Sequence, residues 1–112
     1  MKISTIRDLL EADVLCCEEY LDRDVYSACG SDMMSDVLAY ADEGSLLISG
    51  LLNPQVIRTA HMLDMPCIVF VRGKVPTKEI LTLAEENHIV VLSTPLRMYA
   101  TCGILYTAGL DR

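Results

Sequence analysis

Small polar, glycine and basic residues follow three apolar runs of the sequence, and their types and positions suit ligand binding. Each run ends in a short loop that precedes a segment with helical periodicity. In parallel α/β sheets, ligands bind where strand carboxyl ends meet helix N-termini, because free backbone N–H groups favour anions there. We therefore predict one binding site, made of Ser49, Gly50, Asn53, Arg72, Gly73, Lys74, Thr77, Ser93 and Thr94.

Two basic residues flank a glycine in the second of these loops. Arg72 and Lys74 place positive charges beside Gly73, whose backbone lets a ligand approach closely, so the loop suits a phosphate or carboxylate. The alternative is a solvated loop with an ordinary turn glycine, because the rest of a nucleotide-binding glycine-rich motif is missing. The Ser, Thr and Asn residues of the predicted site also have an alternative role, as caps of the helices that follow.

No recognisable arrangement of nucleophile, base and acid occurs, so we predict that the chain is not an enzyme. His61 and His88 are far apart in the sequence and belong to no metal-binding or catalytic motif. Asp32 and Asp36 flank Ser35 near an expected helix start, where carboxylates are favoured. A catalytic site built from Asp32, Ser35 and His88 is the last of the functional hypotheses, and we expect no metal and no cofactor.

The five cysteines are odd in number and include no C-x-x-C pair. We therefore expect reduced thiols rather than a disulfide framework, a zinc site or an iron–sulfur site. Cys67 begins an apolar run and Cys102 lies in an apolar helix, where a free cysteine packs as a small hydrophobic residue. The adjacent Cys16 and Cys17 are also interpreted as packing residues.

Three apolar strands and the helices between them must position the candidate site. Each strand is continuously apolar, which is typical of parallel strands covered on both faces. The predicted strands are residues 45–49, 67–71 and 89–93. Helix starts are indicated by Asn53 with Pro54, Pro76 with Thr77, and Thr94 with Pro95.

The N-terminal part of the chain is less regular. It is predicted to hold a helix from Ser4 to Glu11, strands at residues 13–17 and 25–30, and an amphipathic helix from Met34 to near Gly44. With the later elements, these predict one compact, three-layer-like α/β domain over residues 1–112. Its largely parallel sheet should have about four to five strands with flanking helices.

The segment 95–108 is apolar around most of its circumference rather than along one stripe. One side of this helix must therefore meet a second surface, which is either the N-terminal part of the same chain or another molecule. In a chain of only 112 residues, a surplus of apolar residues favours a homodimer.

Charge and hydropathy exclude several classes of partner. The formal net charge is −7, and the basic residues are scattered from Lys2 to Arg112, which disfavours binding to nucleic acid or to anionic membranes. No apolar stretch is long enough to span a membrane, and the N-terminus lacks the apolar core of a secretory signal. We expect a cytoplasmic protein.

Five segments of the chain carry a family resemblance: Leu21–Val25, Gly30–Asp36, Leu46–Gly50, Val71–Gly73 and Ile89–Pro95. Their order resembles the DRTGG domain, a regulatory module related to the N-terminal domain of bacterial HPr kinase/phosphorylase. The resemblance implies a compact α/β domain with a largely parallel sheet, and it covers nearly the whole chain. The chain departs from the family pattern after Gly50, where Leu51-Leu52-Asn53 replaces an Asp-Arg pair, and in the Thr-Gly-Gly loop, which is Val71-Arg72-Gly73-Lys74 here.

This resemblance is greatest to stand-alone members of the family, some of which are similar to proteins encoded beside iron-hydrogenase genes in anaerobic bacteria. Together with the residues above, it predicts a non-catalytic regulatory or sensory module that homodimerises and binds a small anionic metabolite, a nucleotide or a partner protein. The alternative is a scaffold or accessory subunit. Such a subunit would contact an enzyme, such as an iron hydrogenase or a kinase-like protein, through the segment 95–108.

Overall fold

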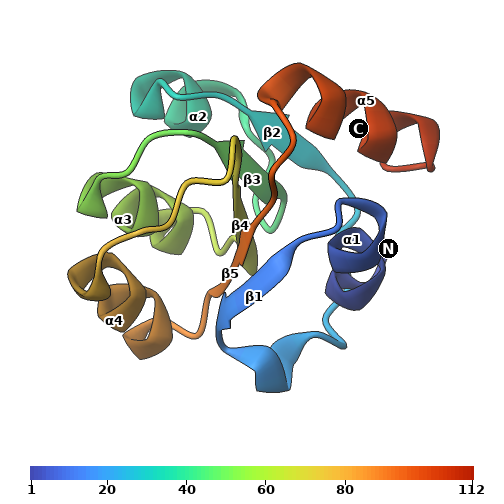
Figure 1. Cartoon of the computed structure of the whole chain (residues 1–112). Helices are drawn as coiled ribbons and strands as arrows, with labels where there is room; N and C mark the ends of the chain where they lie inside the picture. Colours follow the sequence, from blue (N-terminus) through green and yellow to red (C-terminus); the bar gives the residue numbers. More distant parts are fainter.

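Five strands form one sheet in the order β1-β5-β4-β3-β2 (Figure 1). In the computed structural model, which describes all 112 residues, β2 to β5 are parallel and β1 is antiparallel to β5. The predicted three adjacent parallel strands are therefore confirmed. The strands are β1 (Asp13–Cys16), β2 (Ala28–Gly30), β3 (Leu46–Ser49), β4 (Cys67–Phe70) and β5 (Val90–Ser93).

Helices cover both faces of the sheet, which is why β3, β4 and β5 are buried along their whole length. One layer contains α1 (Ile3–Leu9) and α5 (Met98–Thr107), and the other contains α2 (Met34–Tyr40), α3 (Pro54–Met62) and α4 (Lys78–Glu86) (Figure 1). Side chains alternate between the layers along each strand, so Leu46 and Ile48 pack with α1 and α5 while Leu47 packs on the other face. The α/β fold class is confirmed.

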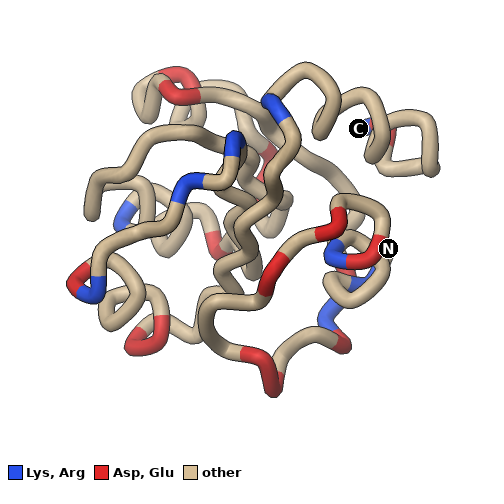
Figure 2. Tube along the Cα trace, in the orientation of Figure 1, with Lys and Arg blue, Asp and Glu red and all other residues tan.

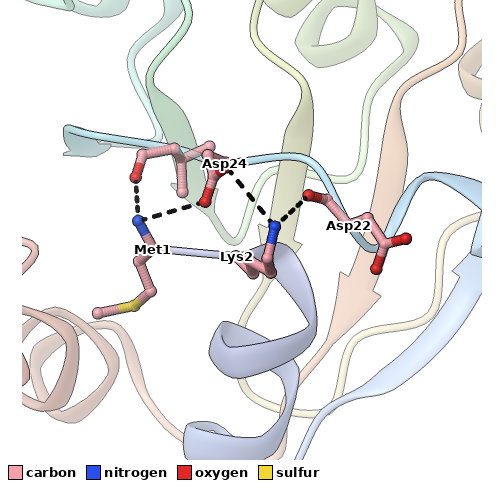
Figure 3. A network of polar contacts seen from close by, with 5 residues as sticks. Met1, Lys2, Asp22 and Asp24 are labelled. Atoms are coloured by element: carbon pink, nitrogen blue, oxygen red, sulfur yellow. Dashed lines mark hydrogen bonds and ion pairs between the residues drawn. The ribbon is translucent and has the colours of Figure 1, made fainter.

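Hydrogen bonds and ion pairs join the start of the chain to the segment before β2 (Figure 3). The Met1 ammonium group donates to the Val25 carbonyl at 2.8 Å and lies 4.0 Å from the Asp24 carboxylate. The Lys2 ammonium group lies 3.7 Å from the same carboxylate and donates to the Asp22 carbonyl at 3.1 Å. Because Val25 also donates its N–H to the Met1 carbonyl, it pairs with the N-terminus, and β2 begins at Ala28 rather than at residue 25.

The helix predicted from Ser4 begins instead at Ile3, with Lys2 at the N-cap position and no capping side chain. The backbone N–H of Ser4 donates to the Leu21 carbonyl at 3.0 Å. Ser4 thus lies inside the helix, and its N–H forms a tertiary hydrogen bond. No helix combines the length and apolar character needed to span a membrane.

The last helix, α5, begins at Met98, three residues later than predicted. The Thr94 hydroxyl accepts a hydrogen bond from the Leu96 N–H at 3.3 Å, which forms a turn before the helix. The inner side of α5 packs on the sheet through Leu105, which is 1% exposed. On its outer side, Tyr99 is 92% exposed. Only one side of this apolar helix is therefore covered within the chain.

Candidate functional site

The carboxyl ends of β3, β4 and β5 lie at one edge of the sheet, which we call the rim. The loop after β4 is bonded to the segment after β5, because Arg72 donates its N–H to the Leu96 carbonyl at 2.7 Å and Gly73 donates to the Thr94 carbonyl at 2.8 Å. The loops after β4 and β5 therefore form one connected surface.

Asp32, which follows β2, organises the β3 side of the rim. Its Oδ1 accepts hydrogen bonds from the Ser49 hydroxyl at 3.0 Å and from the Gly50 N–H at 2.7 Å. The sequence analysis placed Asp32 at a helix start, but α2 begins after Met33 without a side-chain cap. Gly50 belongs to the predicted ligand site, and its N–H is bonded to this carboxylate of the protein itself.

Two of the predicted caps do cap helices. The Asn53 side chain accepts a hydrogen bond from the Gln55 N–H at 2.9 Å at the start of α3. The Thr77 hydroxyl accepts one from the Ile80 N–H at 3.3 Å at the start of α4. These two residues contribute to the rim by fixing where its helices begin.

Ser49, Ser93 and Thr94 are not caps, so that alternative interpretation is wrong for them. Ser93 donates its hydroxyl to the Lys74 carbonyl at 2.8 Å, and Thr94 donates to the Leu10 carbonyl at 2.6 Å. All three side chains are buried. Their hydroxyl hydrogens bond within the protein, so these residues hold the rim loops in place.

Two cations of the rim have no carboxylate within ion-pair distance. Lys74 is half-buried and donates from Nζ to the Gly50 carbonyl at 2.6 Å. Arg72 is exposed, and its guanidinium packs over Gly50, where an added Cβ would lie 2.5 Å from Nη2. Arg72 has a left-handed φ of 61°, uncommon for a residue with a side chain. The predicted pair of positive charges is thus held at the rim.

The N-terminus of α3 has no free hydrogen-bond donor in its first residues. Pro54 has no N–H, Gln55 bonds to the Asn53 side chain, and Val56 donates to the Asn53 carbonyl at 3.0 Å. An anion cannot take its ligands from this helix end without displacing the cap.

The N-terminus of α5 differs, because no side chain caps it. The first three N–H groups of the helix, those of Met98, Tyr99 and Ala100, have no hydrogen-bond partner within the chain. Arg97 is exposed at the N-cap position. In Figure 2, a basic position at the start of α5 lies in the same part of the view as those of the loop after β4.

Arg97 and the free amides were missed by the sequence analysis, which placed the helix start at Pro95. Arg97 then fell inside the helix, where it had no special role. The signal that could have revealed it is Thr94 followed by proline, since a threonine hydroxyl can form its own turn before a helix begins.

The residues of the catalytic hypothesis are not brought together. Asp32 follows β2 at the rim, whereas His88 precedes β5 at the opposite edge of the sheet, where its Nδ1 lies 3.4 Å from the Tyr20 hydroxyl. No group of three or more His, Cys, Asp or Glu side chains is placed to hold a metal ion.

All five cysteine thiols are in environments that disfavour the thiolate. Burial, followed by the neighbouring Cys17, raises the pKa of Cys16 to about 12. Burial is also the main cause that raises the thiol pKa of Cys17, Cys29, Cys67 and Cys102. The thiolate is the reactive form of cysteine, and an activated cysteine has a lowered pKa. None of these five thiols has one.

A family model described as the DRTGG domain matches residues 5–108. A search of curated proteins gives no match. Among solved structures, the chain is similar to the CBS and DRTGG domains of the regulatory region of Clostridium perfringens pyrophosphatase, complexed with activator, diadenosine tetraphosphate, with a TM-score of 0.76 and 24% identity. The similarity covers 93% of this chain and 45% of that one, so this chain spans less than half of that structure.

Proposed function

Because this chain belongs to the DRTGG domain family, we propose that it is a non-catalytic regulatory module that homodimerises and binds a small anionic ligand at the rim. The similar pyrophosphatase structure is a regulatory region bound to an activator that carries phosphates, which supports a regulatory role. The scattered positions of Asp32 and His88 and the raised thiol pKa values give catalysis no comparable support.

The observation that carries the ligand proposal is the open N-terminus of α5 beside Arg72, Lys74 and Arg97. The unpaired N–H groups there carry partial positive charge, and the two guanidinium groups can each donate two parallel hydrogen bonds to a phosphate or carboxylate. The Asp32 carboxylate repels an anion on the β3 side of the rim. The ligand should therefore take its backbone donors from the start of α5 rather than from Gly50, whose N–H is bonded to Asp32.

The outer side of α5 is the proposed homodimer interface. It borders an open hollow of about 520 Å³, and α5 contains no charged residue between Met98 and Thr107. Space is open above Gly103, and Tyr106 is 66% exposed on the same helix as Tyr99. Tyrosines of one copy can pack beside the glycine of another, and a two-fold axis makes the contact reciprocal. An uncharged face also lets two copies of a chain with net charge −7 approach each other.

Ligand and second copy would contact the same helix, which gives the module a means of regulation. An anion at the first turn of α5 orders its amides, while the dimer contact uses the outer side of the same turn through Tyr99. By thermodynamic linkage, a ligand that strengthens dimerisation must bind the dimer more tightly by the same factor.

The test combines calorimetric titration with inorganic pyrophosphate and sedimentation analysis of the free protein. We expect saturable binding of pyrophosphate to the wild-type protein. Affinity should fall about tenfold in Arg72→Gln, because this variant loses one charge-assisted contact. It should be unchanged in the control, Arg58→Gln on α3. Absence of saturable binding to the wild-type protein, or equal weakening in both variants, would overturn the anion proposal.

The dimer is tested separately with Tyr99→Asp. Because Tyr99 is 92% exposed, the Asp side chain should not unfold the monomer. The variant should therefore remain folded but sediment as a monomer. Leu105→Asp is unsuitable for this purpose, because Leu105 is 1% exposed and its replacement would unfold the domain. A wild-type protein that is monomeric at high concentration would contradict the dimer and favour the alternative, an accessory subunit that docks on an enzyme through this surface.

A further inference from the structure

A second polar hollow lies at the edge of the sheet opposite the rim. Its volume is about 260 Å³, and it is lined by the end of α3, by the turns before β4 and β5, and by Arg23 from the segment before β2. Pockets that take drug-sized ligands have volumes of roughly 300–1,000 Å³. This hollow therefore suits a molecule smaller than a nucleotide, and it is separate from the proposed rim site.

Arg23 supplies a fixed positive charge to this hollow. The guanidinium carbon lies 3.8 Å from the centre of the Tyr20 ring, and one nitrogen donates to the His88 carbonyl. The side chain is half-buried and has no carboxylate within ion-pair distance. Stacking fixes the plane of the guanidinium, and its remaining N–H groups are free to donate to a ligand carboxylate.

Asp64 supplies an opposite charge that Arg23 does not neutralise. Both residues line the hollow, and both also line a neighbouring hollow of about 500 Å³ that includes Glu43 and Asp24. No ion pair joins the Arg23 and Asp64 side chains. The carboxyl ends of α3 and α4 add partial negative charge next to the hollow, which favours a cation on this side.

A hollow with one separated positive group and one separated negative group is complementary to a zwitterion. We propose that it binds a free amino acid, with the ligand carboxylate on Arg23 and the ligand ammonium group on Asp64. The two opposite charges distinguish an amino acid from a simple acid or a simple amine.

The experiment measures the melting temperature of the full chain with the standard amino acids added singly, followed by titration calorimetry with the one that raises it most. A specific ligand raises the melting temperature by mass action. The matched probes are the same molecule without its amino group and the same molecule without its carboxyl group. We expect each to bind at least about tenfold more weakly, because each loses one charged contact.

Two variants locate the site. Arg23→Gln and Asp64→Asn should each weaken binding about tenfold, whereas Arg58→Gln should leave it unchanged. Asp64 has a left-handed φ of 51°, which asparagine tolerates well, so Asp64→Asn keeps the test valid even if Arg23→Gln disturbs the fold. The proposal is overturned if no amino acid raises the melting temperature, if the amine alone binds equally well, or if Asp64→Asn binds normally.

Discussion

The helices α3 and α5 both begin at the rim, yet only α5 offers free backbone donors there. At α3, Asn53 and Pro54 leave no donor unused in the first residues. At α5, Arg97 supplies a charge but no cap, and the first N–H groups of the helix have no partner. Position at a strand end therefore does not by itself make an anion site, since the residues before the helix decide whether its donors are free.

The two connections differ because their polar side chains bond in different directions. Asn53 turns forward onto its own helix, whereas Thr94 turns back and donates to the Leu10 carbonyl at 2.6 Å. Thr94 thus fixes the chain before α5 without covering the amides of that helix. A polar residue thus binds an N–H group of α3 at one helix start, whereas at the other it leaves the first N–H groups of α5 free.

The largest expected effect comes from removing the Thr94 hydroxyl. Thr94→Val keeps the shape of the side chain but leaves the buried Leu10 carbonyl and the Leu96 N–H without this partner. We expect a loss of about 2–4 kcal/mol in the free energy of unfolding, since each unsatisfied buried group costs about 1–3 kcal/mol. Denaturant unfolding measures the loss, with Thr107→Val at the exposed end of α5 as a near-neutral control. A change no larger than that of the control would show that Thr94 does not position α5.

The next largest effect on stability is expected from Asp32, on the β3 side of the rim. Asp32→Asn weakens the hydrogen bonds from Ser49 and Gly50, so we expect a loss of about 1 kcal/mol in the free energy of unfolding. Removing the negative charge should also tighten pyrophosphate binding about threefold at low salt, and less at high salt. Calorimetry checks this, with Asp36→Asn on α2 as the control. Weaker pyrophosphate binding in Asp32→Asn would mean that Asp32 supports the ligand.

Removing the α3 cap tests whether free N–H groups at the start of α3 would bind the anion as well as those of α5. Asn53→Ala frees the Gln55 N–H and should lower the free energy of unfolding by about 1 kcal/mol. Pyrophosphate affinity should stay the same, because the proposed site takes its backbone donors from α5 rather than from α3. If uncapping α3 raised affinity severalfold, the start of α3 would take part in binding the anion, contrary to the proposed site.

The smallest effect on stability is expected at Gly50. An added methyl group would lie 2.5 Å from the Arg72 guanidinium, which is the flexible end of an exposed side chain and can move away. Gly50→Ala should therefore change the free energy of unfolding by less than about 0.5 kcal/mol. Pyrophosphate binding should weaken about threefold as Arg72 loses its position. Unchanged affinity would indicate that the placement of the guanidinium over Gly50 has no part in binding.

The sequence was sufficient to predict the central sheet and two helix starts, because these depend on local patterns. Continuous apolar runs correspond to β3, β4 and β5, and Asn53 and Thr77 cap helices as predicted. The strand predicted from residue 25 began at Ala28, because pairing with Met1 is a tertiary contact with no local signal. The partners of Asp32 lie 17 and 18 residues away in the sequence, and no pattern along the chain predicts such a contact.

A titration of isotope-labelled protein with inorganic pyrophosphate, followed by amide nuclear magnetic resonance, tests the difference between the two helix ends most directly. The proposed site predicts saturable shifts for the N–H groups of Met98, Tyr99 and Ala100, with the Gln55 and Val56 signals unmoved. Shifts concentrated at Gln55 and Val56, or no saturable shift at α5, would contradict it.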